Sequence, residues 1–292
     1  MPTRSLFLIC RSLAAVLTAT ALVFAVGSLF GYSNFGATDA AMTAVKSSSA
    51  IWFLNAFLAF SLVLNLALPR TLPRLVFLLA LFPLLVGWRI AALSDLPWIE
   101  LTCLAAFLFF VAMFVLIAAH GLLHPNTDNG RPKATFPTIQ LAFIRLYIGL
   151  DLVPHFTEKL FAGPNTRADD VASFQQLGIS NPLAFVLVAG VIEFAACIGV
   201  GLGVFTRLAA VCTVIYLMTA TIMGHHFLLG FIWASEGGGW EYPVLWSALI
   251  LSFVFGGGRW LSVDEIITEH FKLPNWVLAL MGDTATHTNT RV

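Results

Sequence analysis

Long apolar runs alternate with short polar segments along the whole chain. A helix needs about 20 mainly apolar residues to cross a bilayer, and fewer where the bundle is thin or kinked. The pattern predicts eight such helices, over residues 8–30, 50–68, 75–93, 99–122, 139–155, 182–204, 208–228 and 242–255. Pro154 is expected to bend the outer end of the fifth helix. The predicted fold is therefore all-α, a polytopic integral membrane protein with eight transmembrane helices.

A polar segment over residues 124–133 separates two halves of four spans each. We predict a four-helix membrane region over residues 1–135, to which no role is assigned. A second four-helix bundle is predicted over residues 136–265, followed by a cytoplasmic tail over 266–292 with an interfacial helix. Equal halves allow a parallel duplication, although no residue-level repeat relates them. The first apolar run resembles a signal peptide but is longer than usual, which favours a retained anchor helix.

Composition indicates a lipid environment and removes several function classes. Only 10% of the 292 residues are charged, against about 25% in soluble domains, and mean hydropathy is +0.90. The bilayer is thus the expected partner, and no basic patch indicates nucleic acid. The four cysteines form no C-x-x-C dithiol motif, and neither haem nor metal is indicated. His120 and His124 have the spacing of a metal pair, but without a third ligand nearby they are interpreted as interfacial histidines.

The distribution of basic residues predicts the orientation of the chain. Cytoplasmic loops carry an excess of Lys and Arg. With the N-terminus inside, eleven basic residues lie at the cytoplasmic side and four outside; the four are Lys46, Arg89, Lys159 and Arg167. The eleven are Arg4, Arg11, Arg70, Arg74, Arg131, Lys133, Arg145, Arg207, Arg259, Lys272 and Arg291. Both termini are therefore predicted to be cytoplasmic.

Glu193 is the costliest residue of the second half, because it lies near the middle of an apolar span. An ionisable side chain there costs about 3 kcal/mol or more, so a partner or a function is expected. Helix rise places Arg145 at a similar depth on the neighbouring span. We predict that Glu193 pairs with Arg145, or otherwise with a residue of the span over 208–228. The pair is either catalytic or an ion pair that only fixes helix register.

A second group of titratable and aromatic residues is predicted at the outer surface. Its members end or begin three different spans: His155, Glu158, Lys159, His225, His226, Trp233, Glu236, Trp240, Glu241 and Tyr242. Histidines that move protons, beside flat rings, would suit a quinone head group. The alternative is an aromatic belt with interfacial histidines, which polytopic proteins commonly have.

Short motifs in the second half occur in a fixed order. They are Arg145-x-x-x-Gly149, Glu158-Lys159-Leu160-Phe161, Gly190-x-x-Glu193, GVFTR over 203–207, GGWEY over 238–242 and GRWLSVD over 258–264. In this order and spacing they resemble the DoxX family over residues 141–265. The first 135 or so residues have no counterpart in that resemblance.

The resemblance implies a small membrane bundle that takes part in redox work, in a bacterial-type inner membrane. The family includes the membrane subunit of thiosulfate:quinone oxidoreductase. It suggests a quinone-linked subunit that passes electrons from an outer-face donor, such as a sulfur compound, to membrane quinone. The alternative is a non-catalytic scaffold for a redox or other complex; a transporter is disfavoured because inverted repeats and broken helices are missing. Protein partner subunits or a homo-oligomer are expected.

Site residues follow from these two groups. Glu193, Arg145, His225 and His226 are the catalytic candidates. Candidates for quinone binding are His155, Lys159, Trp240, Glu241 and Tyr242.

Overall fold

The computed structural model describes residues 2–30, 49–125, 127–128 and 131–282. They form helices joined by turns and loops, together with one pair of two-residue antiparallel strands, β1 (Thr127–Asp128) and β2 (Arg131–Pro132). Within the described part, seven helices are long and apolar enough to cross a membrane, and an eighth apolar helix over Glu241–Gly256 is shorter. The prediction of an all-α polytopic membrane protein is confirmed. Lys46, Arg291 and the end of the predicted tail lie outside the described residues.

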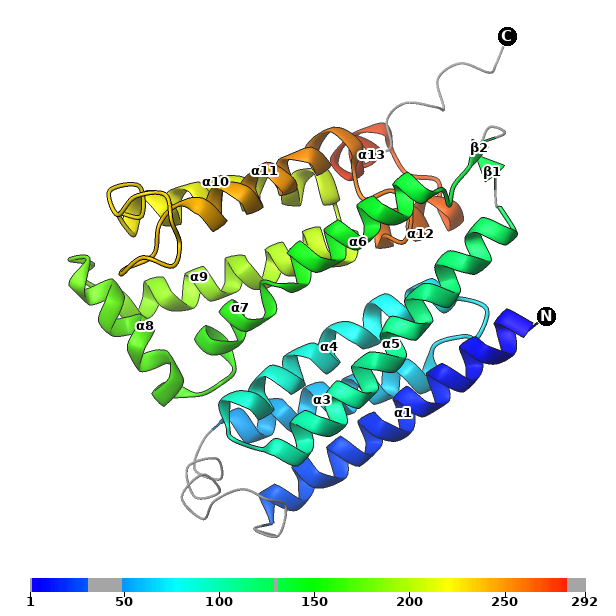
Figure 1. Cartoon of the computed structure of the whole chain (residues 1–292), viewed down its shortest axis with the longest axis horizontal. Coiled ribbons are helices and arrows are strands. Elements are labelled where there is room, and N and C mark those ends of the chain that lie inside the picture. Colours follow the sequence, from blue (N-terminus) through cyan, green and yellow to red (C-terminus); the bar gives the residue numbers. More distant parts are fainter. Residues whose placement is uncertain (1, 31–48, 126, 129–130, 283–292) are drawn as a thin grey trace. The chain divides into compact units, whose positions relative to one another are not determined.

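The chain forms two compact units (Figure 1). Unit 1 comprises Met1–Asn126 and Val153–Ala172, and unit 2 comprises Thr127–Leu152 and Ser173–Val292. The domain boundaries predicted at residues 135 and 265, and the orientation in the membrane, stay predictions.

Unit 1 is built around four helices, α1 (Pro2–Leu29), α3 (Ala50–Ala67), α4 (Pro73–Leu93) and α5 (Pro97–Leu123). Each packs on two of the others, with α1 and α4 both lying between α3 and α5. Proline begins α4 and α5, where its fixed φ and missing N–H suit the first turn. Some polar side chains inside use backbone acceptors: Arg11 donates to the carbonyl of Asn65. Such bonds satisfy groups that lipid cannot.

The predicted fifth span is two helices, α6 (Phe136–Leu150) and α7 (Val153–Leu160). Pro154 lies in the first turn of α7, a position where its missing N–H is tolerated. The bend expected at this proline stays a prediction. Thr135 and Thr138 form a capping box that begins α6. α7 packs on α4 in unit 1, and the polar helix α8 (Pro164–Gln176), which apolar periodicity did not indicate, follows it.

Unit 2 contains α6, α9 (Pro182–Ala196), the π-helix η1 (Cys197–Gly203), α10 (Thr206–Met223) and α11 (Glu241–Gly256), with the short helices α12 (Val263–His270) and α13 (Asn275–Met281). α9 and η1 together form the predicted sixth span. η1 packs against α6 so closely that a Cβ on Gly149 would lie 2.2 Å from the Cα of Gly201. Only glycine allows this approach of two backbones.

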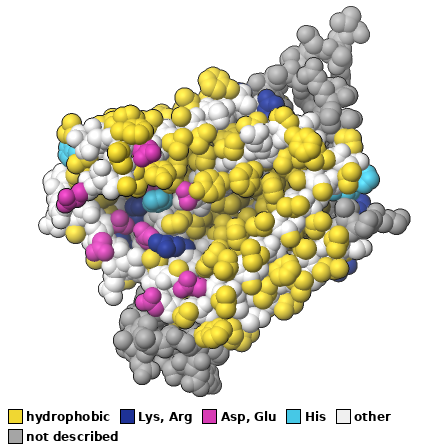
Figure 2. All heavy atoms as spheres, in the orientation of Figure 1, with side chains coloured by type: hydrophobic (Ala, Val, Ile, Leu, Met, Phe, Trp, Pro, Cys, Tyr) yellow, Lys and Arg dark blue, Asp and Glu magenta, His cyan; other side chains and the backbone are white. Residues whose placement is uncertain are grey.

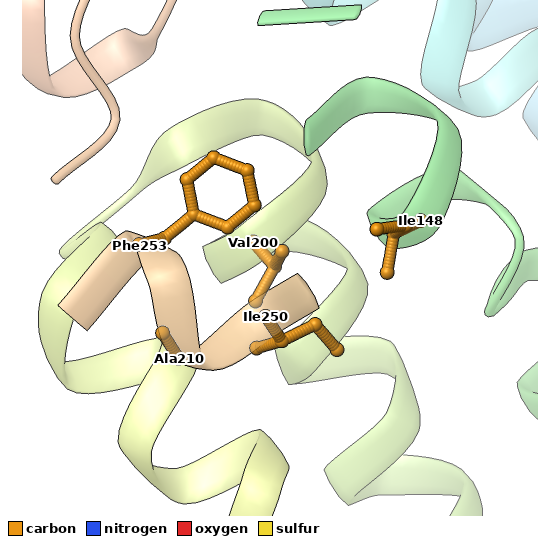
Figure 3. Packing of buried hydrophobic residues seen from close by; sticks show 5 residues of the cluster. All are labelled: Ile148, Val200, Ala210, Ile250 and Phe253. Carbon is orange, nitrogen blue, oxygen red and sulfur yellow. The ribbon is translucent and has the colours of Figure 1, made fainter. Parts of the chain in front are cut away.

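The core of unit 2 is a small apolar cluster of Ile148, Val200, Ala210, Ile250 and Phe253. Figure 3 shows these side chains directed toward one another from α6, η1, α10 and α11. The opposite faces of the helices carry exposed apolar side chains such as Phe143 and Val188. Hydrophobic side chains accordingly cover much of the face in Figure 2, as expected for contact with lipid.

Candidate functional site

Arg145 is fully buried in α6 and gives its hydrogen bonds to backbone carbonyls. Its Nη1 donates to the carbonyls of Val200 at 3.0 Å and Gly201 at 2.5 Å. Its Nη2 donates to the carbonyl of Leu261 at 2.5 Å, in the turn before α12. The last carbonyls of a helix have no intrahelical partner. Arg145 therefore satisfies carbonyls at the end of η1 and connects η1 to the turn before α12.

Glu193 does not pair with Arg145, so the first-choice partner predicted for it is wrong. The Glu193 side chain is 6% exposed, and its Oε1 accepts a 2.7 Å hydrogen bond from the hydroxyl of Tyr216 in α10. The alternative prediction, a partner within residues 208–228, is confirmed. Similar depth was not enough to make the ion pair: Arg145 bonds to Val200, seven residues and about 10 Å of helix beyond Glu193.

Asp264 holds the first turn of α10. Its Oδ1 accepts from the N–H of Phe205 at 2.8 Å, and its Oδ2 accepts from the N–H and hydroxyl of Thr206 at 2.8 and 2.7 Å. Phe205 is in the left-handed region at φ 47°, so the chain turns sharply here. Burial raises the pKa of the Asp264 carboxyl, and the bonds from Thr206 and Phe205 and the charge of Arg145 partly offset this.

Arg207 closes two more helix ends. Its Nε donates to the carbonyl of Val254 in α11 at 2.7 Å, and its Nη1 donates to Ala279 in α13 at 3.0 Å. We call Arg145, Thr206, Arg207 and Asp264 the turn network. Nearly all of their polar contacts stabilise backbone turns of unit 2, so their chemistry is that of capping.

The opposite end of α10 leads into a segment that we call the aromatic loop, residues 224–242, which includes the first two residues of α11. Its two ends pair through backbone bonds from Trp240 to the carbonyl of Gly230 and from Glu241 to that of Phe231. A Cβ on Gly239 would lie 2.5 Å from the carbonyl oxygens of Gly230 and Phe231. Glycine at 239 is thus required for the loop to close.

Side chains of the aromatic loop gather around Trp233. The ring centroids of His226 and Tyr242 lie 5.7 and 5.8 Å from that of Trp233. The Oε2 of Glu241 accepts from the N–H of Trp233 at 3.2 Å, while Trp240 packs edge-on against Phe231. Trp233 and Tyr242 stay 41% and 47% exposed, so flat apolar surface remains open beside polar atoms.

His226 is held in one tautomer when neutral. Its Nδ1 lies 3.0 Å from the carbonyl oxygen of Gly238. Because a carbonyl only accepts, Nδ1 carries the proton and Nε2 remains an acceptor. His225 is exposed and takes a left-handed backbone at φ 57°. The two neighbouring histidines therefore differ: His226 is bonded to the loop backbone, and His225 is exposed. Glu236 is exposed as well.

Comparison with known proteins supports the resemblance to the DoxX family. The DoxX family model matches residues 140–226. An uncharacterized protein of Haemophilus influenzae is 31% identical over 125 residues, which cover 43% of this chain and 88% of that protein. The chain belongs to the DoxX family. No solved structure matches it significantly.

The DoxX match runs from α6 into the aromatic loop and includes Arg145, Glu193, Tyr216 and His226. It joins residues of the turn network with residues of the Glu193 pair and the aromatic loop in one segment. The remaining partners, Leu261 and Asp264, lie beyond the matched residues and meet the segment only in the folded unit 2.

His155 and Lys159, the other two predicted site residues, belong to unit 1. His155 is exposed, while Lys159 is buried with its Nζ donating to the carbonyl of His155 at 3.2 Å. Glu158 forms an ion pair with Arg89 of α4. Burial raises the pKa of the Asp170 carboxyl in α8, and the charge of Lys159 opposes this. That His155 and Lys159 lie together with the aromatic loop stays a prediction.

Sequence reasoning missed Tyr216 as the partner of Glu193. A signal was present, because a tyrosine inside an apolar span needs an acceptor for its hydroxyl. Among the described residues, no group of three or more His, Cys, Asp or Glu is placed to hold a metal ion.

Proposed function

We propose that this DoxX protein is the membrane subunit of a quinone-linked redox system. In this role it passes electrons from a donor at the outer face, with sulfur compounds as candidates, to membrane quinone. The observation that supports the proposal is the aromatic loop, where His226 and Glu241 border the exposed rings of Trp233 and Tyr242. Partner subunits or further copies of the chain would complete the electron path.

The residues of the loop fit a quinone head group. Exposed indole and phenol rings provide flat surfaces, and their apolar surroundings suit an isoprenoid tail arriving from lipid. A bound quinone supplies a carrier of two electrons and two protons. His226 can donate a proton from Nε2 when charged and accept one there when neutral, since Gly238 holds the other nitrogen. Glu241 adds a second titratable group beside Trp233.

Quinone binding and quinone-coupled activity of the purified protein, with its native partners, test this proposal. If His226 and Glu241 relay protons, His226→Ala and Glu241→Gln should each lower the activity by about 10²-fold or more. Glu236→Gln, in the same loop but exposed, is the matched control and should keep parental activity. Unchanged activity in both loop variants would overturn the proposed role of this site.

A non-catalytic scaffold is the second candidate, and the turn network supports it. Arg145, Arg207 and Asp264 direct their bonds to backbone groups of unit 2. A scaffold requires a rigid bundle but no proton relay. In that case the loop variants would retain full activity of the complex, whereas Arg145 variants would lose folded protein and the partner together.

A further inference from the structure

Two helices of unit 2 each bury a hydroxyl that forms no hydrogen bond in the structure. The side chain of Thr213 in α10 is 1% exposed and that of Ser247 in α11 is 6% exposed. Both hydroxyl oxygens are buried without a partner. Leaving one such group unsatisfied costs about 1–3 kcal/mol, and lipid offers no remedy. Two unsatisfied hydroxyls in one small bundle indicate that a ligand binds there.

The two hydroxyls enter unit 2 at the same level. Ala210 of α10 and Ile250 of α11 lie in the same core cluster, which sets the register of this antiparallel pair (Figure 3). Thr213 lies three residues after Ala210, and Ser247 lies three residues before Ile250, so each is about 4.5 Å along its helix from that level. Thr213 and Ser247 share the faces of those two residues.

The next turn of α10 adds Tyr216, which donates to Glu193 at 2.7 Å. Tyr216 follows Thr213 by three residues, so the two side chains are neighbours on the helix surface. Three hydroxyls and a carboxyl therefore lie within about one helical turn. Above the apolar layer of Ala210 and Ile250, unit 2 has a polar layer.

We propose that Thr213 and Ser247, together with Tyr216 and Glu193, form an internal water-binding site in the membrane interior. Hydroxyls both donate and accept, which matches the needs of water, and buried waters usually bond to about three polar groups. None of the four side chains carries a fixed positive charge, so an anionic ligand does not suit the site. Water here gives the Glu193–Tyr216 pair a hydrogen-bonded neighbour that exchanges protons. The proposal goes beyond the quinone site and does not depend on it.

Hydroxyl-radical footprinting of the full chain in lipid nanodiscs tests the proposal. Radicals formed from water held in place oxidise adjacent side chains, and mass spectrometry locates the product. Tyr216 should be labelled in the parent protein, and Thr213→Val should lower that labelling severalfold. Ser247→Ala should do the same and provides an independent test if one variant fails to fold.

Thr221→Val is the matched control. Thr221 is 2% exposed in the same helix, but its hydroxyl donates to the carbonyl of Leu217 at 2.6 Å and needs no water. Labelling of Tyr216 should stay at the parental level in this variant. Labelling of Tyr147, which is 63% exposed on α6, should be the same in all proteins. No labelling of Tyr216 in the parent, or equal labelling in folded Thr213→Val and Ser247→Ala proteins, would overturn the proposal.

Thermal unfolding gives a second criterion with opposite signs. If the hydroxyl of Thr213 is dry, Thr213→Val removes an unsatisfied group and raises Tm. If the hydroxyl binds water, the substitution removes a ligand of that water and lowers Tm. A higher Tm would therefore contradict the water-binding site.

Discussion

The two ends of α10 use their polar residues in opposite ways. At the start, Thr206 and Arg207 join Arg145 and Asp264 in a buried turn network whose bonds go to backbone groups. At the other end, His226 lies in the aromatic loop beside rings that remain partly exposed. The start of α10 is thus held by hydrogen bonds to backbone groups, whereas the loop after its end presents partly exposed aromatic rings beside titratable side chains.

This contrast distinguishes two roles for an ionisable residue that is costly to bury. A buried charge whose hydrogen bonds are used by the backbone has little capacity left for chemistry, as with Arg145. A titratable group that retains an unused ring nitrogen or carboxyl oxygen beside exposed surface can act on a ligand. Substitutions at the first end should therefore affect folding, and those at the second end should affect binding.

The largest effect is expected for Arg145→Met. The change leaves the carbonyls of Val200, Gly201 and Leu261 without their donor, and it should cost about 3–5 kcal/mol of unfolding free energy. Folded yield and thermal unfolding in detergent measure it. Arg259→Met, at an exposed arginine in the neighbouring turn, is the control and should be near parental. A folded Arg145→Met protein with parental Tm would contradict the proposed difference between the two ends of α10.

Asp264→Asn should have the second largest effect, a loss of about 1–3 kcal/mol of unfolding free energy, because an amide cannot accept all three bonds from Phe205 and Thr206.

The pKa of Asp264 also predicts a pH dependence of stability. Burial raises it above 3.8, so the folded state binds this proton more tightly than the unfolded chain. The resulting stabilisation is complete below pH 3.8 and is lost as pH rises through the folded-state pKa. Unfolding measured across this interval should show that loss in the parent, and a smaller one in the Asn variant.

Trp240→Ala should have the smallest effect on folding and a clear effect on binding. Trp240 packs on Phe227 and Phe231 inside the aromatic loop, away from the core cluster. We expect quinone affinity to fall about tenfold, equivalent to about 1.4 kcal/mol, with Tm nearly unchanged. Titration with a soluble quinone analogue, with Phe255→Ala at an exposed lipid-facing position as control, measures it. Unfolding of Trp240→Ala as severe as that of Arg145→Met would show that both ends are structural.

Much of this architecture was readable from the sequence. Apolar run length located the long apolar helices of the described residues with ends within six residues of those observed, because lipid requires a continuous apolar helix to cover each crossing. The motif order indicated the DoxX family. That Glu193 has a polar partner also followed from the sequence, because an ionisable side chain inside the bilayer is costly without one.

The identity of that partner was decided by tertiary structure. Helix rise gives depth along a span, but it does not say which face meets which neighbour, so Arg145 and Tyr216 could not be ranked correctly for Glu193. The turn network depends on Leu261 and Asp264, more than fifty residues beyond the turn at 205–206, and on left-handed turns that composition does not reveal. The sequence by itself determined which segments enter the membrane, because that depends on local apolar content. Only the packed unit 2 decided which buried polar groups bond to backbone and which remain available for a ligand, because this depends on contacts between distant segments.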